Sequence, residues 1–158
     1  MSEGSGASSD SRPEEKAAGQ PVPGAEDVHA WYRRGMELLG RGSAAAAAQV
    51  LQRASAAEPG SRSVREALAR AQFDAGRYAE AADNFRLIVE ASPSDDYAHF
   101  GLGLSLARTG DPAAAAEYLA LAAAMRPDAA HYTAALRSVR ATLRAIQAAG
   151  GPGEGDAG

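Results

Sequence analysis

The 158-residue chain contains no cysteine, one lysine (Lys16), and few aromatic residues: one tryptophan, five tyrosines and three phenylalanines. Without cysteine, disulfides, thiolate chemistry and cysteine-ligated zinc are excluded, and nothing indicates an oxidising compartment. No segment approaches the roughly 20 consecutive apolar residues that span a bilayer, so no membrane association is expected. The opening MSEGSGASSDSRPEEK lacks the apolar run of a secretory signal. These absences predict a soluble, cytoplasmic protein, and the preference for arginine over lysine suggests a bacterial source.

The weak net charge of -4 is unevenly distributed along the chain. Acidic residues dominate the first 27 residues, while residues 28–149 hold 12 acidic and 14 basic residues. A body so close to neutrality lacks the basic surface of a dedicated nucleic-acid binder. Ser, Gly, Pro and Glu dominate residues 1–26, and 150–158 read GGPGEGDAG, so both segments are predicted to be disordered tails.

Between the tails, four residue types recur with a period of 34. Such a fixed period indicates tandem structural units that stack on one another. Small residues also recur at the middle of each unit, at Gly35, Ala69 and Gly103. The four columns are Gly42, Gly76 and Gly110; Pro59, Pro93 and Pro127; Ala47, Ala81 and Ala115; and Leu51, Phe85 and Leu119.

Each column has a physical reason within a helical hairpin. A glycine ends the first helix in a left-handed turn, and a proline closes the unit because the residue before it avoids the helical region. Ser43 and Asp111 can cap the helices that follow, and Pro112 suits a first helical position. Small residues allow two helix axes to approach closely. The sequence therefore predicts an all-α chain with units at 28–61, 62–95 and 96–129.

Residues 130–148 are predicted to form a closing helix. Its apolar residues follow helical steps, and Arg137, Arg140 and Arg144 occupy another face, as expected of a helix that caps a repeat stack. A solvated arginine face is favoured over a nucleic-acid or lipid contact. The apolar residues are Tyr132, Leu136, Val139, Leu143 and Ile146.

These units resemble the tetratricopeptide repeat (TPR) family. The first unit carries the signature most completely, and the resemblance covers about 120 residues. Arg34 stands where the family usually has leucine, and Arg65 and His99 replace the tryptophan of the first unit. The matching residues are Ala30, Trp31, Tyr32, Gly35, Leu38, Ala47, Leu51, Ala54 and Pro59.

The resemblance implies a right-handed α-solenoid in which the first helix of each pair lines a concave groove that holds a peptide or helix of a partner protein. Exposed Tyr, Phe, Met and Arg are typical of interface hot spots. The opposing interpretation is that these aromatics pack within the superhelix and bind nothing. The implied groove residues are His29, Tyr32, Met36, Leu39, Ser63, Glu66, Arg70, Phe73, Asp74, Tyr97, Phe100, Leu104, Arg108 and His131.

One TPR subfamily grips the carboxyl-terminal tails of heat-shock chaperones with lysines, asparagines and arginine. At the corresponding places this chain has side chains that cannot hold a carboxylate, so chaperone-tail binding is disfavoured. Recognition through apolar contacts is expected instead, with Arg70 and Arg108 pairing with acidic residues at the edge. The replaced clamp positions are Tyr32, Met36, Ala67, Tyr97 and Gly101.

No catalytic or cofactor motif is found, so a non-catalytic adaptor is predicted and no cofactor or metal is expected. The three histidines, His29, His99 and His131, lack metal-ligand spacing and are interpreted as surface or groove residues. The doublet Asp95 and Asp96 is interpreted as a helix-start signal. The alternative function is a regulatory or self-assembling structural subunit, a homo-oligomer that uses the solenoid ends or the convex face.

Overall fold

The computed structural model describes residues 24–155, with side chains to residue 150. Within this part the chain forms seven helices and no strand, which confirms the predicted all-α class. The disorder predicted for residues 1–23 and 156–158 lies outside the described residues. The helices are α2 (Ala25–Gly40), α3 (Ala44–Ala57), α4 (Arg62–Asp74), α5 (Tyr78–Ala91), α6 (Asp96–Arg108), α7 (Pro112–Met125) and α8 (Ala130–Gly155).

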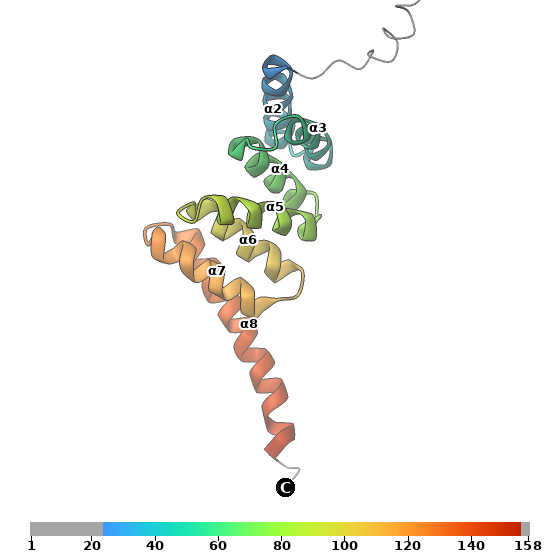
Figure 1. Cartoon of the computed structure of the whole chain (residues 1–158). Helices are drawn as coiled ribbons and strands as arrows, with labels where there is room; N and C mark the ends of the chain where they lie inside the picture. Colours follow the sequence, from blue (N-terminus) through green and yellow to red (C-terminus); the bar gives the residue numbers. More distant parts are fainter. Residues whose placement is uncertain (1–23, 156–158) are drawn as a thin grey trace, which may run out of the picture.

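The helices stack in chain order, from blue α2 to red α8, as consecutive hairpins (Figure 1). Each helix packs on the next one along the chain. The first helices also contact one another, α2 with α4, α4 with α6 and α6 with α8, whereas α3, α5 and α7 make no such contacts within the described part. Closer approach on one side curves the stack, so α2, α4 and α6 form its inner layer.

The three glycines of the 34-residue period form identical turns. Gly42, Gly76 and Gly110 have φ of 81°, 82° and 90°, a left-handed conformation that favours glycine. At the first turn, the Gly42 N–H donates to the Leu39 carbonyl and the Ser43 N–H to the Leu38 carbonyl, at 3.0 and 2.8 Å. The same pair of bonds recurs at the other two turns. The predicted turn role is confirmed, and these bonds satisfy carbonyls that the helix end leaves free.

Two of the three predicted helix caps are confirmed. Asp95 and Asp111 accept backbone N–H groups at the starts of α6 and α7, at 3.0 and 3.1 Å, and Pro112 is the first residue of α7. Ser43 occupies the cap position of α3, but its side chain makes no capping hydrogen bond. The prediction for Ser43 was wrong, although Asp111 caps α7 from a similar backbone conformation.

Two helix ends differ from the predicted boundaries. α2 begins at Ala25, inside the predicted tail, because the Asp27 carboxylate accepts the Gly24 N–H at 3.2 Å and two acids lie in the first turn, where they favour the helix dipole. α8 runs to Gly155, past the Gly-Gly-Pro step that was predicted to stop it. Glycine accepts helical angles, and proline's fixed φ is itself helical, so this step weakens a helix without always ending it.

The large apolar residues of the 34-residue period lie in the core, as predicted. Leu51, Phe85 and Leu119 are at most 2% exposed, and each packs beneath a first helix. A Cβ added at Gly103 would lie 2.6 Å from Leu119 Cγ, which explains the small-residue column at mid-helix. The inner helices can therefore cross the outer ones at close range.

Two of the departures from the family pattern are accommodated in different ways. Arg65 donates to the Asn84 side chain and to the Pro59 carbonyl, at 2.9 and 2.8 Å, so it ties α4 to α5. His99 is only 4% exposed, and its Nδ1 lies 2.8 Å from the Asp95 carbonyl oxygen. The interpretation of His99 as a surface or groove histidine was wrong, because it fills the space of a core aromatic beside Tyr118.

Candidate functional site

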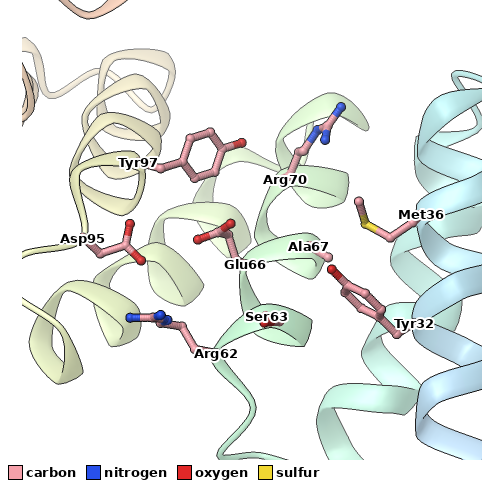
Figure 2. Close-up of a pocket in the computed structure, with 9 residues that line it drawn as sticks. All are labelled: Tyr32, Met36, Arg62, Ser63, Glu66, Ala67, Arg70, Asp95 and Tyr97. Atoms are coloured by element: carbon pink, nitrogen blue, oxygen red, sulfur yellow. The ribbon is translucent and has the colours of Figure 1, made fainter. Parts of the chain in front are cut away.

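A cavity of about 430 Å³ lies on the inner layer between α2, α4 and the start of α6. Figure 2 shows Tyr32 and Met36 of α2 facing Asp95 and Tyr97 across the width of α4. Helices α2 and α6 thus supply the walls and α4 supplies the floor. The side chains lining the cavity are Tyr32, Met36, Arg62, Ser63, Glu66, Ala67, Arg70, Asp95 and Tyr97.

Two further cavities continue this one along the inner layer. Arg70 and Tyr97 also line a cavity of about 200 Å³ over α6, whose other walls are mostly apolar. At the opposite end, Tyr32 and Ser63 also line a cavity of about 360 Å³ beside the start of α2. Because neighbouring cavities share walls, we treat the three as one concave groove and call them its central, C-terminal and N-terminal cavities.

Most residues that the sequence placed in the groove line one of these cavities. The central cavity holds six of them, and the C-terminal cavity adds residues from α4 and α6. His131 does not line a cavity but packs edge-on against Phe100, with ring centroids 5.2 Å apart. In order along the groove, the lining residues are His29, Tyr32, Met36, Ser63, Glu66, Arg70, Tyr97, Phe73, Asp74, Phe100 and Leu104.

Besides His131, two more of the implied groove residues line none of the three cavities. Leu39 is only 8% exposed and packs in the core with Leu51 and Leu68, because α3 and α4 cover that side of α2. Arg108 lines none of the three cavities: its guanidinium donates to the Tyr78 hydroxyl at 2.9 Å and lies over the Phe73 ring. This bond ties Arg108 to α5, beside the C-terminal cavity that Phe73 lines. Leu39 therefore lies outside the groove, and Arg108 borders it without lining a cavity.

The centre of the groove carries two carboxylates and two guanidinium groups. Figure 2 shows the carboxylates of Glu66 and Asp95 turned toward one another. Within the described part of the chain Glu66 forms no hydrogen bond or ion pair. Arg62 donates to Ser92 Oγ at 3.3 Å, and Arg70 Nε lies 4.0 Å from an Asp74 carboxylate oxygen. Each arginine thus contacts a residue outside the central cavity, whereas the two carboxylates face one another within it.

This arrangement shifts the titration of two groove residues. Burial, and then the nearby charge of Asp95, raise the pKa of the Glu66 carboxyl above its ordinary value, although Arg62 opposes the shift. Burial also raises the pKa of the Tyr97 hydroxyl, although Arg70 opposes it. Both groups therefore lie where water is partly excluded, which strengthens any polar contact made there.

Aromatic stacking closes the groove at α8. Phe100 stacks on Tyr132 with centroids 4.6 Å apart, and the Tyr132 hydroxyl donates to Asp96 Oδ2 at 2.6 Å. Arg126 Nη1 lies 3.8 Å from the same oxygen. Burial and this hydrogen bond raise the pKa of Tyr132. The hydrogen bond and the ring stacking hold α8 against α6 at this end of the groove.

Sequence reasoning missed two charged residues that line the central cavity, Arg62 and Asp95. Asp95 is the predicted helix cap, and its Oδ1 does accept the Ala98 N–H. Its position at the head of α6 also sets it on the groove wall. Arg62 gave no signal, because it precedes the part of α4 whose positions the family pattern assigns to the groove.

The described residues offer no constellation for catalysis or metal binding. Among them no three His, Asp or Glu side chains gather closely enough to hold a metal ion. In the same part of the chain no helix is both long enough and apolar enough to cross a membrane. What the groove offers is a mixed aromatic and charged surface.

Stacked hairpins with a groove along their first helices define a helical-repeat solenoid, a class built for extended contact surfaces. Residues 32–96 and 66–130 each match the family described as "Tetratricopeptide repeat". The two matches together span more than half of the chain, which therefore belongs to the tetratricopeptide repeat family. No curated protein sequence matches it significantly.

Solved structures with the same fold share little sequence with this chain. The first TPR of Spaghetti (RPAP3), solved bound to the HSP90 peptide SRMEEVD, is similar with 17% identity and a TM-score of 0.71 over 78% of this chain and 98% of that one. MamA from Desulfovibrio magneticus RS-1 is similar with 19% identity and a TM-score of 0.72, over 76% and 68%. The Sgt2 TPR domain from Aspergillus fumigatus has 17% identity and a TM-score of 0.71, over 80% and 84%.

Proposed function

We propose that this chain is a non-catalytic adaptor that binds a peptide or helix of a partner protein in the concave groove. The observation that carries the proposal is the run of three cavities whose walls include half-exposed aromatic and apolar side chains, among them Tyr32, Tyr97 and Phe100. Such side chains in a concavity gain the most from a partner that excludes water. The RPAP3 domain, which has the same fold and was solved with a peptide bound, supports this proposal.

The partner is not expected to be an acidic chaperone tail of the kind seen with RPAP3. The peptide SRMEEVD ends in acidic residues and a carboxylate. The positions where such tails are held carry Tyr32, Met36 and Ala67 here, and the central acids Glu66 and Asp95 would repel it. A cytoplasmic location and a bacterial source stay predictions from the sequence.

A matched pair of variants tests the proposal. Tyr32→Glu places a charge where the central and N-terminal cavities meet, whereas Leu121→Glu makes a similar change on the outer helix α7, where Leu121 is 47% exposed. In affinity purification from the native host followed by mass spectrometry, the wild type and Leu121→Glu should capture the same partner, and Tyr32→Glu should not. Circular dichroism should show equal helicity in all three.

The opposite result would point to another surface. If Tyr32→Glu captures the partner as well as the wild type does, and Leu121→Glu does not, the convex face is the binding site and the groove assignment is wrong.

Self-assembly through the ends of the stack is the alternative. Analytical ultracentrifugation separates the two proposals: the adaptor is expected to be a monomer, and a stable oligomer without peptide binding would favour the structural-subunit alternative.

A further inference from the structure

We propose that the partner segment carries a lysine or arginine that pairs with Glu66 and Asp95 in the central cavity, and an apolar side chain that fills the C-terminal cavity. This inference rests on the proposed function, because it specifies the chemistry of the segment that the groove accepts. It predicts a basic and apolar ligand, opposite in charge to an acidic tail.

The proposed basic residue of the ligand follows from the environment of the Glu66 and Asp95 carboxylates. Glu66 is half-buried and has no partner among the described residues, and Asp95 uses only Oδ1, for the Ala98 N–H. A partner laid over the groove removes the remaining water from both carboxylates. A buried charge that loses water without gaining a hydrogen bond is strongly unfavourable. A cationic side chain between the two acids restores those bonds and offsets the charge.

The two arginines of the cavity do not supply that cation. Both line the central cavity, but each is engaged by another side chain: Arg62 donates to Ser92 Oγ, and Arg70 Nε lies 4.0 Å from an Asp74 carboxylate oxygen. Both guanidinium groups are exposed, so they stay hydrated when a partner binds between them. They therefore do not require an acidic residue in the ligand. The half-buried acids therefore decide the preferred charge of the ligand.

The apolar residue is required by the C-terminal cavity. Three phenylalanines and a leucine make up half of its lining residues, and at Gly101, which has no side chain, the ring of the buried Phe85 packs directly against the α6 backbone. Arg70 and Tyr97 line both this cavity and the central one. The two side chains of the ligand must therefore be close neighbours, two apart in an extended segment or three to four apart in a helix. The apolar wall consists of Phe73, Phe85, Phe100 and Leu104.

The inference also predicts how binding responds to pH. The pKa of Glu66 is raised in the free protein, and the groups facing Glu66 are Arg62 and Arg70 on its own helix and Asp95, Asp96 and Tyr97 from α6. A cation stabilises the ionised carboxylate, so the bound state holds fewer protons than the free state near that raised pKa. Binding should weaken as the pH falls from neutrality toward that pKa, and Glu66→Gln should remove this part of the dependence.

A random peptide library displayed on phage, selected on the full chain, supplies the probe. Enriched peptides should carry Lys or Arg within four residues of Leu, Met or Phe. By isothermal titration calorimetry, Glu66→Gln should bind the best synthetic peptide about tenfold more weakly, which corresponds to about 1.4 kcal/mol. Glu117→Gln, the same change at an exposed site on the outer helix α7, should bind as the wild type does. With the peptide's basic residue replaced by glutamine, Glu66→Gln should cause no further loss.

Two failures have different meanings. If the selected peptides depend on Tyr32 but are acidic or neutral, and bind Glu66→Gln with unchanged affinity, this inference is overturned while the groove remains the binding site. If no selected peptide loses affinity on Tyr32→Glu, the proposed function itself is wrong, and the inference is overturned with it.

Discussion

The close approach of α6 and α7 at Gly103 allows a sharp test of how the stack is packed. A Cβ added at Gly103 would lie 2.6 Å from Leu119 Cγ, 2.8 Å from Leu119 Cδ2 and 3.2 Å from the Ala115 carbonyl oxygen. Favourable contacts between such atoms begin at about 3.5 Å. Leu119 is fully buried and the third neighbour is backbone, so neither can move aside freely. Gly103→Ala must therefore push the two helices apart.

The expected magnitude follows from two opposing effects. Overpacking a close-packed core costs about 1–3 kcal/mol, and two contacts this short indicate the upper end of that range. Alanine is favoured over glycine inside a helix by about 1 kcal/mol. We expect Gly103→Ala to lower the free energy of unfolding by about 2 kcal/mol.

Gly40 provides the matched control, since it lies in α2 with open space where a Cβ would be added. Gly40→Ala should leave stability unchanged or raise it by up to about 1 kcal/mol. Both variants can be measured by urea unfolding followed by circular dichroism. With a slope of about 2 kcal/mol per molar urea, the midpoint for Gly103→Ala should fall by about 1 M. A Gly103→Ala variant as stable as Gly40→Ala would refute the close approach of α6 and α7.

The same unfolding assay checks three further predictions. Tyr132→Phe should lower the free energy of unfolding by about 1 kcal/mol, because it removes the hydrogen bond to the Asp96 carboxylate. Because the pKa of Tyr132 is raised in the folded protein, wild-type stability should fall as the pH rises above 10, and Tyr132→Phe should lose less stability over that range. Leu39→Ala should cost about 2–5 kcal/mol as a core truncation, and Met36→Ala clearly less; equal losses would contradict the burial assigned to Leu39. Gln72→Ala should lower the free energy of unfolding by about 1–3 kcal/mol, because the Gln72 amide forms hydrogen bonds with two polar side chains of α5. An unchanged free energy of unfolding would show that water replaces these bonds.

Much of this fold could be predicted because its signals are local. A left-handed turn after a helix favours glycine, and a proline two residues beyond a helix end prevents its continuation, so the ladder from Gly42 to Pro127 marked the units directly. The helix ends at Ala25 and Gly155 were predicted less well. Glycine and proline weaken a helix there without excluding it, and the two acids in the first turn of α2 favour its earlier start.

The groove was predicted in outline from the family resemblance, and its detail needed the coordinates. Met36 and Leu39 lie three residues apart on one face of α2, yet Met36 borders the central cavity and Leu39 lies in the core. Periodicity gives the direction in which a side chain points, but burial also depends on which neighbouring helix covers that direction. His99 was misjudged for the same reason, because nothing in the sequence shows the outer helix that covers it.

By itself the sequence determined the all-α class, the 34-residue unit, the turn residues and the absence of a clamp for acidic tails, since each depends on a residue type at one position or on spacing along the chain. Only the tertiary structure brought Glu66 on α4 together with Asp95 at the start of α6, and only it left both carboxylates half-buried in a cavity whose two arginines are engaged by Ser92 and Asp74. The placement of charges on different helices depends on distances between segments that are remote in the chain. The proposed preference for a basic ligand therefore rests on the junction of neighbouring repeats.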